Sequence, residues 1–239
     1  MPHEFEIRRT VPLPASPDQV WEAIATPAGL AGWFMPMPID PAGAGVKVWE
    51  PGKRLLVEPP AGADGSTQAF EYLIEGGDGG TTVLRFVHSG FLGGDWNDEF
   101  EAMTGAGWDM YLHTLSQYLA YFPGRSTTYV EADGPASSAA PDGWAALIAA
   151  VGGGTDPQVG VEVRIALPSA EALAGVVDYR SGTFLGLRTA DALVRFHGRA
   201  PIGMTVAVSH HAYRDLDAAA TMRAWQEWLA AIWAVGEAE

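Results

Sequence analysis

Hydrophobic and polar residues alternate along several short stretches of the first half of the chain, and this period of two predicts β-strands. Strand-like segments occur at residues 5–11, 46–49, 54–58, 68–74 and 82–88. The last two are separated by a glycine-rich run at residues 76–80, which is typical of a hairpin turn. We therefore expect consecutive antiparallel strands that form one sheet.

A longer period, of three to four residues, predicts helices on either side of the later strands. Ser16 and Gln19 have the spacing of a capping box at a helix N-terminus, and Pro27 should end that helix. A second short helix is expected over residues 28–34. From about residue 97 to residue 122 a broad apolar stripe predicts a long helix, whose only large packing partner is the antiparallel sheet.

The second half of the chain repeats this order of elements. Residues 17–25 read PDQVWEAIA, and residues 141–149 read PDGWAALIA. Strand-like segments then follow at residues 159–167, 172–179, 182–187, 193–197 and 204–210. A helical pattern over residues 216–234 comes after them. The echo favours two similar domains, residues 1–124 and residues 125–239, over one large domain.

Composition narrows the range of partners. The chain has 14 basic and 29 acidic residues, a formal net charge of -15, which repels nucleic acid and anionic lipid surfaces. It has no cysteine, which excludes disulfides, thiolate catalysis and cysteine-ligated zinc. The first twenty residues lack a signal-peptide pattern, and no run approaches the roughly 18 apolar residues of a membrane span. We therefore expect a cytoplasmic protein without a membrane span.

A set of short motifs in the first half resembles a known family. The set comprises Val11-Pro12, the segment at residues 16–27, Trp33-Phe34, the segment at residues 86–91, Gly107-Trp108, Leu112, Leu115 and Tyr118-Leu119. Together these motifs resemble the family named for the activator of the 90-kDa heat-shock protein ATPase. That family belongs to the START-like, or SRPBCC, superfamily, which also includes the birch-pollen allergen.

The resemblance covers roughly residues 5–122 and implies an α+β fold of the helix-grip type. In this fold a curved antiparallel sheet wraps around a long C-terminal helix, with two short helices after the first strand and a cavity between sheet and helix. The family usually has a glycine-rich strand pair where this chain has a short, proline-rich segment at residues 36–51. The second half resembles the family only through its element order and the Pro-Asp-Trp echo, which indicates a degenerate second copy.

Few residues have the pattern of catalytic or metal sites. Nucleophile-elbow, P-loop, dinucleotide-binding and zincin motifs are missing from the sequence. His88 shares a strand face with Leu84 and Phe86, so its imidazole either faces the cavity as an acid, base or donor or is a hydrogen-bonded core histidine. His210 and His211 should point to opposite faces of a strand, which disfavours joint metal binding. We expect no catalytic residue, no metal and no cofactor.

Several large side chains come from elements whose one face points to the interior of a helix-grip domain. They are Trp33, Phe34, Trp49, Phe70, Tyr72, Phe86, His88, Trp108, Tyr111, Leu112 and Leu115. Any one of the aromatic residues is explained by core packing, but together they exceed what a solid core of this size needs. We expect them to line a partly open apolar pocket that holds a ligand.

The leading function from the sequence is therefore binding of a small hydrophobic or aromatic molecule, without defined catalysis. Two alternatives stay open. The resemblance also implies a cyclase-like or hydratase-like enzyme, for which His88 is the candidate acid or base. The name of the family also suggests a protein-interaction module that regulates a chaperone. A homodimer is a further possible assembly, in which the second domain is the dimerising partner.

Overall fold

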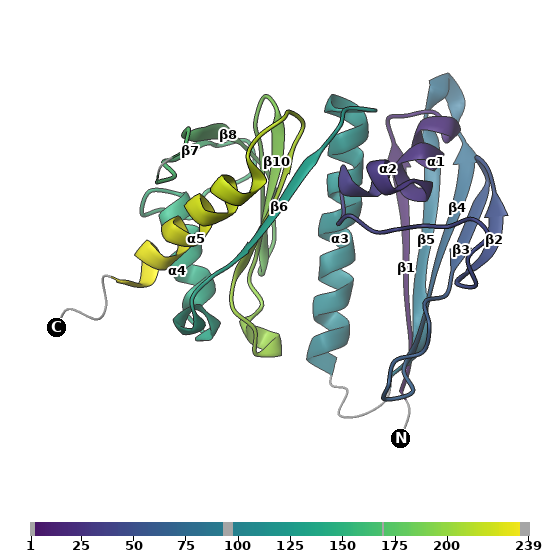
Figure 1. The fold of residues 1–239 in the computed structure, drawn as a ribbon, viewed down its shortest axis with the longest axis horizontal. Helices are drawn as coiled ribbons and strands as arrows, with labels where there is room; N and C mark the ends of the chain where they lie inside the picture. Colours follow the sequence, from purple (N-terminus) through teal and green to yellow (C-terminus); the bar gives the residue numbers. More distant parts are fainter. Residues whose placement is uncertain (1–2, 93–97, 169, 235–239) are drawn as a thin grey trace. The chain divides into compact units, whose positions relative to one another are not determined.

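The computed structural model describes residues 3–92, 98–168 and 170–234 of the chain. Two compact units make up the protein, Met1–Arg125 and Ser126–Glu239. Both units combine an antiparallel sheet with helices, as the sequence pattern predicts (Figure 1). The α+β fold class is thus confirmed.

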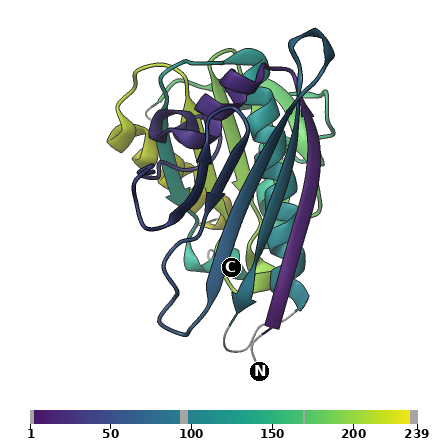
Figure 2. The ribbon, with the colours of Figure 1, turned by 90° about the vertical axis from the view of Figure 1, so that its right-hand side faces the viewer.

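The first unit contains a five-stranded antiparallel sheet in the order β1-β5-β4-β3-β2 (Figure 2). Its strands are β1 His3–Leu13, β2 Val46–Glu50, β3 Arg54–Val57, β4 Thr67–Gly76 and β5 Thr82–Leu92. Strands β2 to β5 follow one another as a meander, and β1 pairs with β5, with Ile7 opposite His88. A single 3-10 turn, η1 Asp78–Gly80, joins β4 to β5.

Two short helices follow β1, and their ends are set by local side-chain hydrogen bonds. Helix α1 is Pro17–Ala25, and its N-terminus has the predicted capping box between Ser16 and Gln19. Helix α2 is Pro27–Ala31, where the Thr26 hydroxyl accepts the Gly29 backbone N–H at 3.0 Å. It stops before the predicted end at residue 34 because the chain turns tightly at Gly32, whose N–H bonds to the Gly29 carbonyl.

Helix α3, Asp98–Tyr121, lies along one face of the sheet (Figure 1). Its buried side chains include Trp108, Leu112 and Leu115, and the sheet contributes buried residues such as Ile7 and Phe86. The predicted long helix is confirmed over these residues, while residue 97 lies outside the described residues. A meander closed by β1, with two short helices after β1 and a long helix after β5, is the helix-grip arrangement.

The second unit has a six-stranded antiparallel sheet in the order β6-β11-β10-β9-β8-β7. Its elements are β6 Thr128–Asp133, η2 Ala136–Ala139, α4 Gly143–Val151, β7 Glu162–Ile165, β8 Leu173–Arg180, β9 Phe184–Arg188, β10 Ala192–His197, η3 Ala200–Ile202, β11 Ala207–Ala212 and α5 Ala218–Ala234. As in the first unit, the first strand pairs with the last, a helix follows the first strand, and the last strand leads into a helix. The duplication itself stays a prediction that this shared order supports.

Helices α1 and α2 pack closely because Gly29 has no side chain. A Cβ atom there would lie 2.1 Å from the Glu22 carbonyl oxygen and 2.7 Å from the Ala23 Cα. Both are backbone atoms, so a larger residue would force the two helices apart. We expect Gly29→Ala to lower the free energy of unfolding in urea by about 1–3 kcal/mol.

The matched control is Ala28→Ser, a change at the neighbouring, exposed position of the same helix. It should alter the free energy of unfolding by less than about 0.5 kcal/mol. Equal stability of Gly29→Ala and the control would show that the helix pair separates without cost.

Candidate functional site

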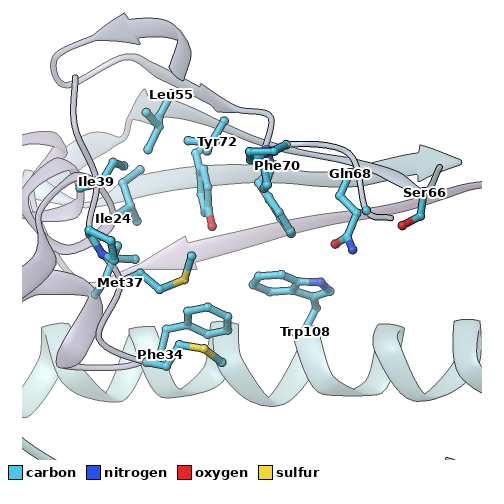
Figure 3. Close-up of a pocket in the computed structure, with 17 residues that line it drawn as sticks. Ile24, Phe34, Met37, Ile39, Leu55, Ser66, Gln68, Phe70, Tyr72 and Trp108 are labelled. Atoms are coloured by element: carbon cyan, nitrogen blue, oxygen red, sulfur yellow. The ribbon is translucent and has the colours of Figure 1, made fainter. Parts of the chain in front are cut away.

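A pocket with a volume of about 420 Å³ lies in the first unit, between the sheet and α3 (Figure 3). Helices α1 and α2, the segment after α2, strands β3 and β4 and their connecting loop, and α3 all contribute to its wall. The lining residues are Ile24, Leu30, Phe34, Met35, Met37, Pro38, Ile39, Leu55, Val57, Pro59, Pro60, Gly62, Ser66, Gln68, Phe70, Tyr72 and Trp108.

The sheet side of the pocket follows from the two-residue period of its strands. Gln68, Phe70 and Tyr72 alternate along β4 and share the face that looks toward α3 (Figure 3). On β3, Leu55 lies opposite Tyr72 and Val57 lies opposite Phe70. The paired strands therefore place four of these side chains next to one another in the wall.

Among the residues that the structure describes, no charged side chain lines the pocket. Its polar side chains are Ser66 and Gln68, which lie at one end, and Tyr72 between that end and the apolar one (Figure 3). Burial raises the pKa of the Tyr72 phenol, so its hydroxyl stays protonated at neutral pH. The site can exclude water from an apolar molecule and offer it a few neutral hydrogen-bonding groups.

Four of the eleven residues predicted from the sequence line this pocket: Phe34, Phe70, Tyr72 and Trp108. Phe34 and Trp108 stack with ring centroids 5.6 Å apart and an interplanar angle of 14°. Phe70 lies 5.9 Å from Trp108, centroid to centroid. The structure therefore brings these aromatic side chains, which come from distant parts of the sequence, together around one space.

The other seven predicted residues do not line the pocket and pack around it instead: Trp33, Trp49, Phe86, His88, Tyr111, Leu112 and Leu115. Trp33 is fully buried, and its Nε1 donates to the Ala23 carbonyl at 3.0 Å. Trp49 packs edge-on against Trp21, with ring centroids 5.0 Å apart. A side chain that faces inward does not line the pocket when another ring lies between it and the pocket.

The remaining predicted residues support side chains of the wall. Phe86 is buried 4.2 Å from Trp108, and Tyr111 contacts Phe34 edge-on at 4.7 Å, both measured between ring centroids. Leu112 and Leu115 on α3 are buried. These residues fix the positions of the lining rings.

The sequence prediction missed the loop residues of the pocket. Met35, Met37 and Ile39 line it from the proline-rich segment after α2, and Pro59 and Pro60 line it from the loop after β3. Loops have no hydrophobic period that could reveal their inner face. The signal available was the run of apolar residues separated by prolines at residues 35–39, which is unusual for a solvated loop.

His88 on β5 lies behind the pocket wall and is held by hydrogen bonds to both ring nitrogens. Trp108 Nε1 donates to His88 Nδ1 at 2.9 Å, and His88 Nε2 lies 3.1 Å from Gln68 Oε1. Phe70 stacks on the imidazole, with centroids 4.4 Å apart, and Phe5 contacts its edge at 4.9 Å. Burial lowers the pKa of His88 to about 4.

These contacts decide between the two interpretations of His88. Because an indole N–H only donates, Nδ1 is the acceptor and the neutral ring carries its proton on Nε2. Both nitrogens are therefore occupied, and neither is available to move a proton to or from a ligand. His88 is a hydrogen-bonded core histidine, and its geometry does not support the role of catalytic acid or base.

The second unit contains a similar pair. Trp225 Nε1 on α5 donates to His210 Nδ1 on β11 at 3.2 Å, and burial lowers the pKa of His210 to about 4. The adjacent His211 faces the opposite side of β11 and lies near Tyr129, with ring centroids 5.1 Å apart, as the sequence predicts for neighbouring residues of a strand.

The described part of the chain contains no group of three or more His, Asp or Glu side chains that could hold a metal ion. None of its helices combines the length and the apolar character that crossing a bilayer requires.

Comparisons with known proteins match this chain only at the level of structure. No protein-family model matches it, and no curated protein matches it. Solved structures do match, and both Aha1-like proteins and a di-domain aromatase/cyclase are among them.

Three solved structures illustrate the similarity. DynU16, from the dynemicin biosynthetic locus, is 18% identical, with 95% of each chain covered and a TM-score of 0.39. The di-domain aromatase/cyclase BexL, from the BE-7585A biosynthetic pathway, is 12% identical, with 87% of this chain and 84% of BexL covered and a TM-score of 0.42. An AHSA1-like protein from Rhizobium etli is 26% identical, with 52% of this chain and 88% of that protein covered and a TM-score of 0.38.

The hydrogen bonds of His88 predict its tautomer and its titration. Long-range ¹H–¹⁵N spectra distinguish a protonated ring nitrogen from an unprotonated one. We expect Nε2 to be protonated and Nδ1 to be unprotonated at pH 7, with no change until the pH approaches about 4. Titration near the ordinary value, or a proton on Nδ1, would contradict the hydrogen-bond arrangement.

The same residue makes stability depend on pH. In the unfolded chain His88 titrates near its ordinary value of 6.5, whereas the folded ring stays neutral down to about 4. The unfolded state therefore binds the proton first, and this contribution to stability, complete above about pH 6.5, is lost as the pH falls toward 4. Relative to His88→Phe, the free energy of unfolding of the wild type should fall by about 1 kcal/mol per pH unit in this window. If the free energies of unfolding of the two proteins run parallel between pH 6.5 and pH 4, this prediction is wrong.

Proposed function

We propose that the first unit binds an uncharged, largely apolar small molecule in the pocket between its sheet and α3. The observation that carries this proposal is a space of about 420 Å³ that is lined, within the described part of the chain, by no charged side chain. This volume falls within the range of roughly 300–1,000 Å³ that is common for small-molecule sites. Aromatic, aliphatic, proline and methionine side chains make up most of the lining residues.

The lining also restricts the charge of the ligand. An ionised group placed in an apolar pocket loses its hydration and needs an opposite charge in compensation. The pocket residues provide none, and the formal net charge of -15 further disfavours anions. A neutral ligand meets neither obstacle.

Binding is favoured over catalysis at this site. The candidate acid or base, His88, has both ring nitrogens in hydrogen bonds and does not line the pocket. A chaperone partner, which rests on the family resemblance, and a homodimer formed through the second unit remain predictions. We therefore propose ligand binding alone for the first unit.

A pocket-filling substitution tests the proposal. Val57 lines the pocket from β3, and Val57→Trp should occupy the space with an indole ring. The probe is a neutral propionyl-substituted dimethylaminonaphthalene, whose fluorescence reports transfer from water to an apolar site. We expect Val57→Trp to weaken its binding by about tenfold or more, which corresponds to about 1.4 kcal/mol.

Leu56→Trp is the matched control, because the adjacent side chain on β3 points to the opposite face of the strand and does not line the pocket. It should bind the probe as the wild type does. Wild-type affinity of Val57→Trp would show that the probe binds elsewhere, and absence of binding to the wild type would refute the proposal for neutral aromatic ligands.

A further inference from the structure

A chain of hydrogen bonds runs from α3 through β5 to a side chain that lines the pocket. It starts at the Trp108 indole N–H, passes through the His88 imidazole and ends at the Gln68 side-chain oxygen. Trp108 and His88 are 6% and 5% exposed, so the first two members are shielded from water. Gln68 is the exposed member, and it lies at the polar end of the pocket with Ser66 (Figure 3).

The direction of this chain is fixed by chemistry. The indole of Trp108 can only donate, which makes His88 Nδ1 an acceptor. A neutral imidazole has one donor and one acceptor, so His88 Nε2 is the donor and its partner on Gln68 is the amide oxygen. The oxygen and nitrogen of a glutamine amide are nearly indistinguishable by shape. The hydrogen bond from His88 therefore decides that the Gln68 oxygen faces the imidazole.

The amide nitrogen of Gln68 remains available. It makes no hydrogen bond to any of the residues that the structure describes, and the side chain lines the pocket. Two N–H donors are thus presented at the open end of a largely apolar space. In the empty pocket water can accept from them, and a bound molecule that displaces this water must replace its hydrogen bond or lose affinity.

We infer that Gln68 donates a hydrogen bond to an uncharged oxygen acceptor of the ligand, such as a carbonyl, and that His88 and Trp108 position it to do so. This inference rests on the proposed function and names the chemical class of the ligand. The ligand is an apolar molecule with a neutral acceptor at the end that lies near Gln68 and Ser66. Gln68 is the specificity-determining residue, and His88 is a positioning residue.

A carbonyl suits this position better than a carboxylate. A carboxylate would also accept from the amide N–H groups, but no lysine or arginine of the described ranges lines the pocket to offset its charge. Trp108 offers no second donor, because its N–H is already used by His88. The hydrogen-bonding capacity at this end therefore fits one neutral acceptor.

Two matched probes test the inference. One is the propionyl-substituted dimethylaminonaphthalene, and the other is its propyl analogue, which lacks the carbonyl oxygen. The measured quantity, obtained from fluorescence titrations, is the dissociation constant of the propyl analogue divided by that of the ketone. We expect Gln68→Leu, which keeps a similar size but has no donor, to weaken binding of the ketone by about three- to tenfold and to leave the propyl analogue unchanged.

The positioning role of His88 is tested by His88→Phe. This change keeps a ring between Phe5 and Phe70 but removes both hydrogen bonds of the imidazole. The Gln68 amide can then turn either way, so the preference for the ketone should fall while binding of the propyl analogue persists. His210→Phe, which removes the similar pair of the second unit, is the control and should leave the ratio unchanged.

The outcomes separate the inference from the proposed function. If both probes bind in the pocket and Gln68→Leu does not change their ratio, the inference is overturned while pocket binding stands. If Gln68→Leu lowers the ratio and His88→Phe does not, the positioning role of His88 is overturned. If neither probe binds to the wild type, the inference and the proposed function fail together.

Discussion

The hydrogen bond from Trp108 Nε1 to His88 Nδ1 is the contact on which the arrangement of helix and sheet in the first unit depends. A buried indole N–H without an acceptor would cost about 1–3 kcal/mol, so α3 must present Trp108 to the acceptor on β5. This requirement fixes the rotation of the helix about its axis. The Trp108 ring then lies between Phe86 behind it and Phe34 beside it, and the rings of Trp108 and Phe34 form part of the wall of the pocket.

The second unit repeats this bond between its last strand and its last helix, but the surrounding aromatic side chains differ. Trp225 is fully buried, with Phe196 at 5.8 Å and Trp228 at 5.6 Å between ring centroids. Here the rings pack on one another, whereas in the first unit Phe34, Phe70 and Trp108 surround a space. The same hydrogen bond between helix and sheet thus occurs beside closely packed rings in the second unit and beside the pocket in the first.

Burial also explains why a histidine in this position suits binding better than catalysis. The environment that keeps His88 neutral removes it from the pH range in which an imidazole exchanges protons readily. Its fixed tautomer instead orients the Gln68 amide at the open end of the pocket. A group that the sequence offers as an acid or base becomes, in this packing, part of the scaffold that shapes the polar end of an apolar site.

The sequence by itself determined the strands, the capped helix at Ser16, the long helix and the inward faces of these elements, because hydrophobic period and capping are local properties. It also included Phe34, Phe70, Tyr72 and Trp108 among the side chains expected to face the interior, and all four line the pocket. Only the tertiary structure decided which inward residues meet the pocket and which lie behind its wall. That choice depends on distances between elements and on the path of the loops at residues 35–39 and 58–66, which no periodic pattern encodes.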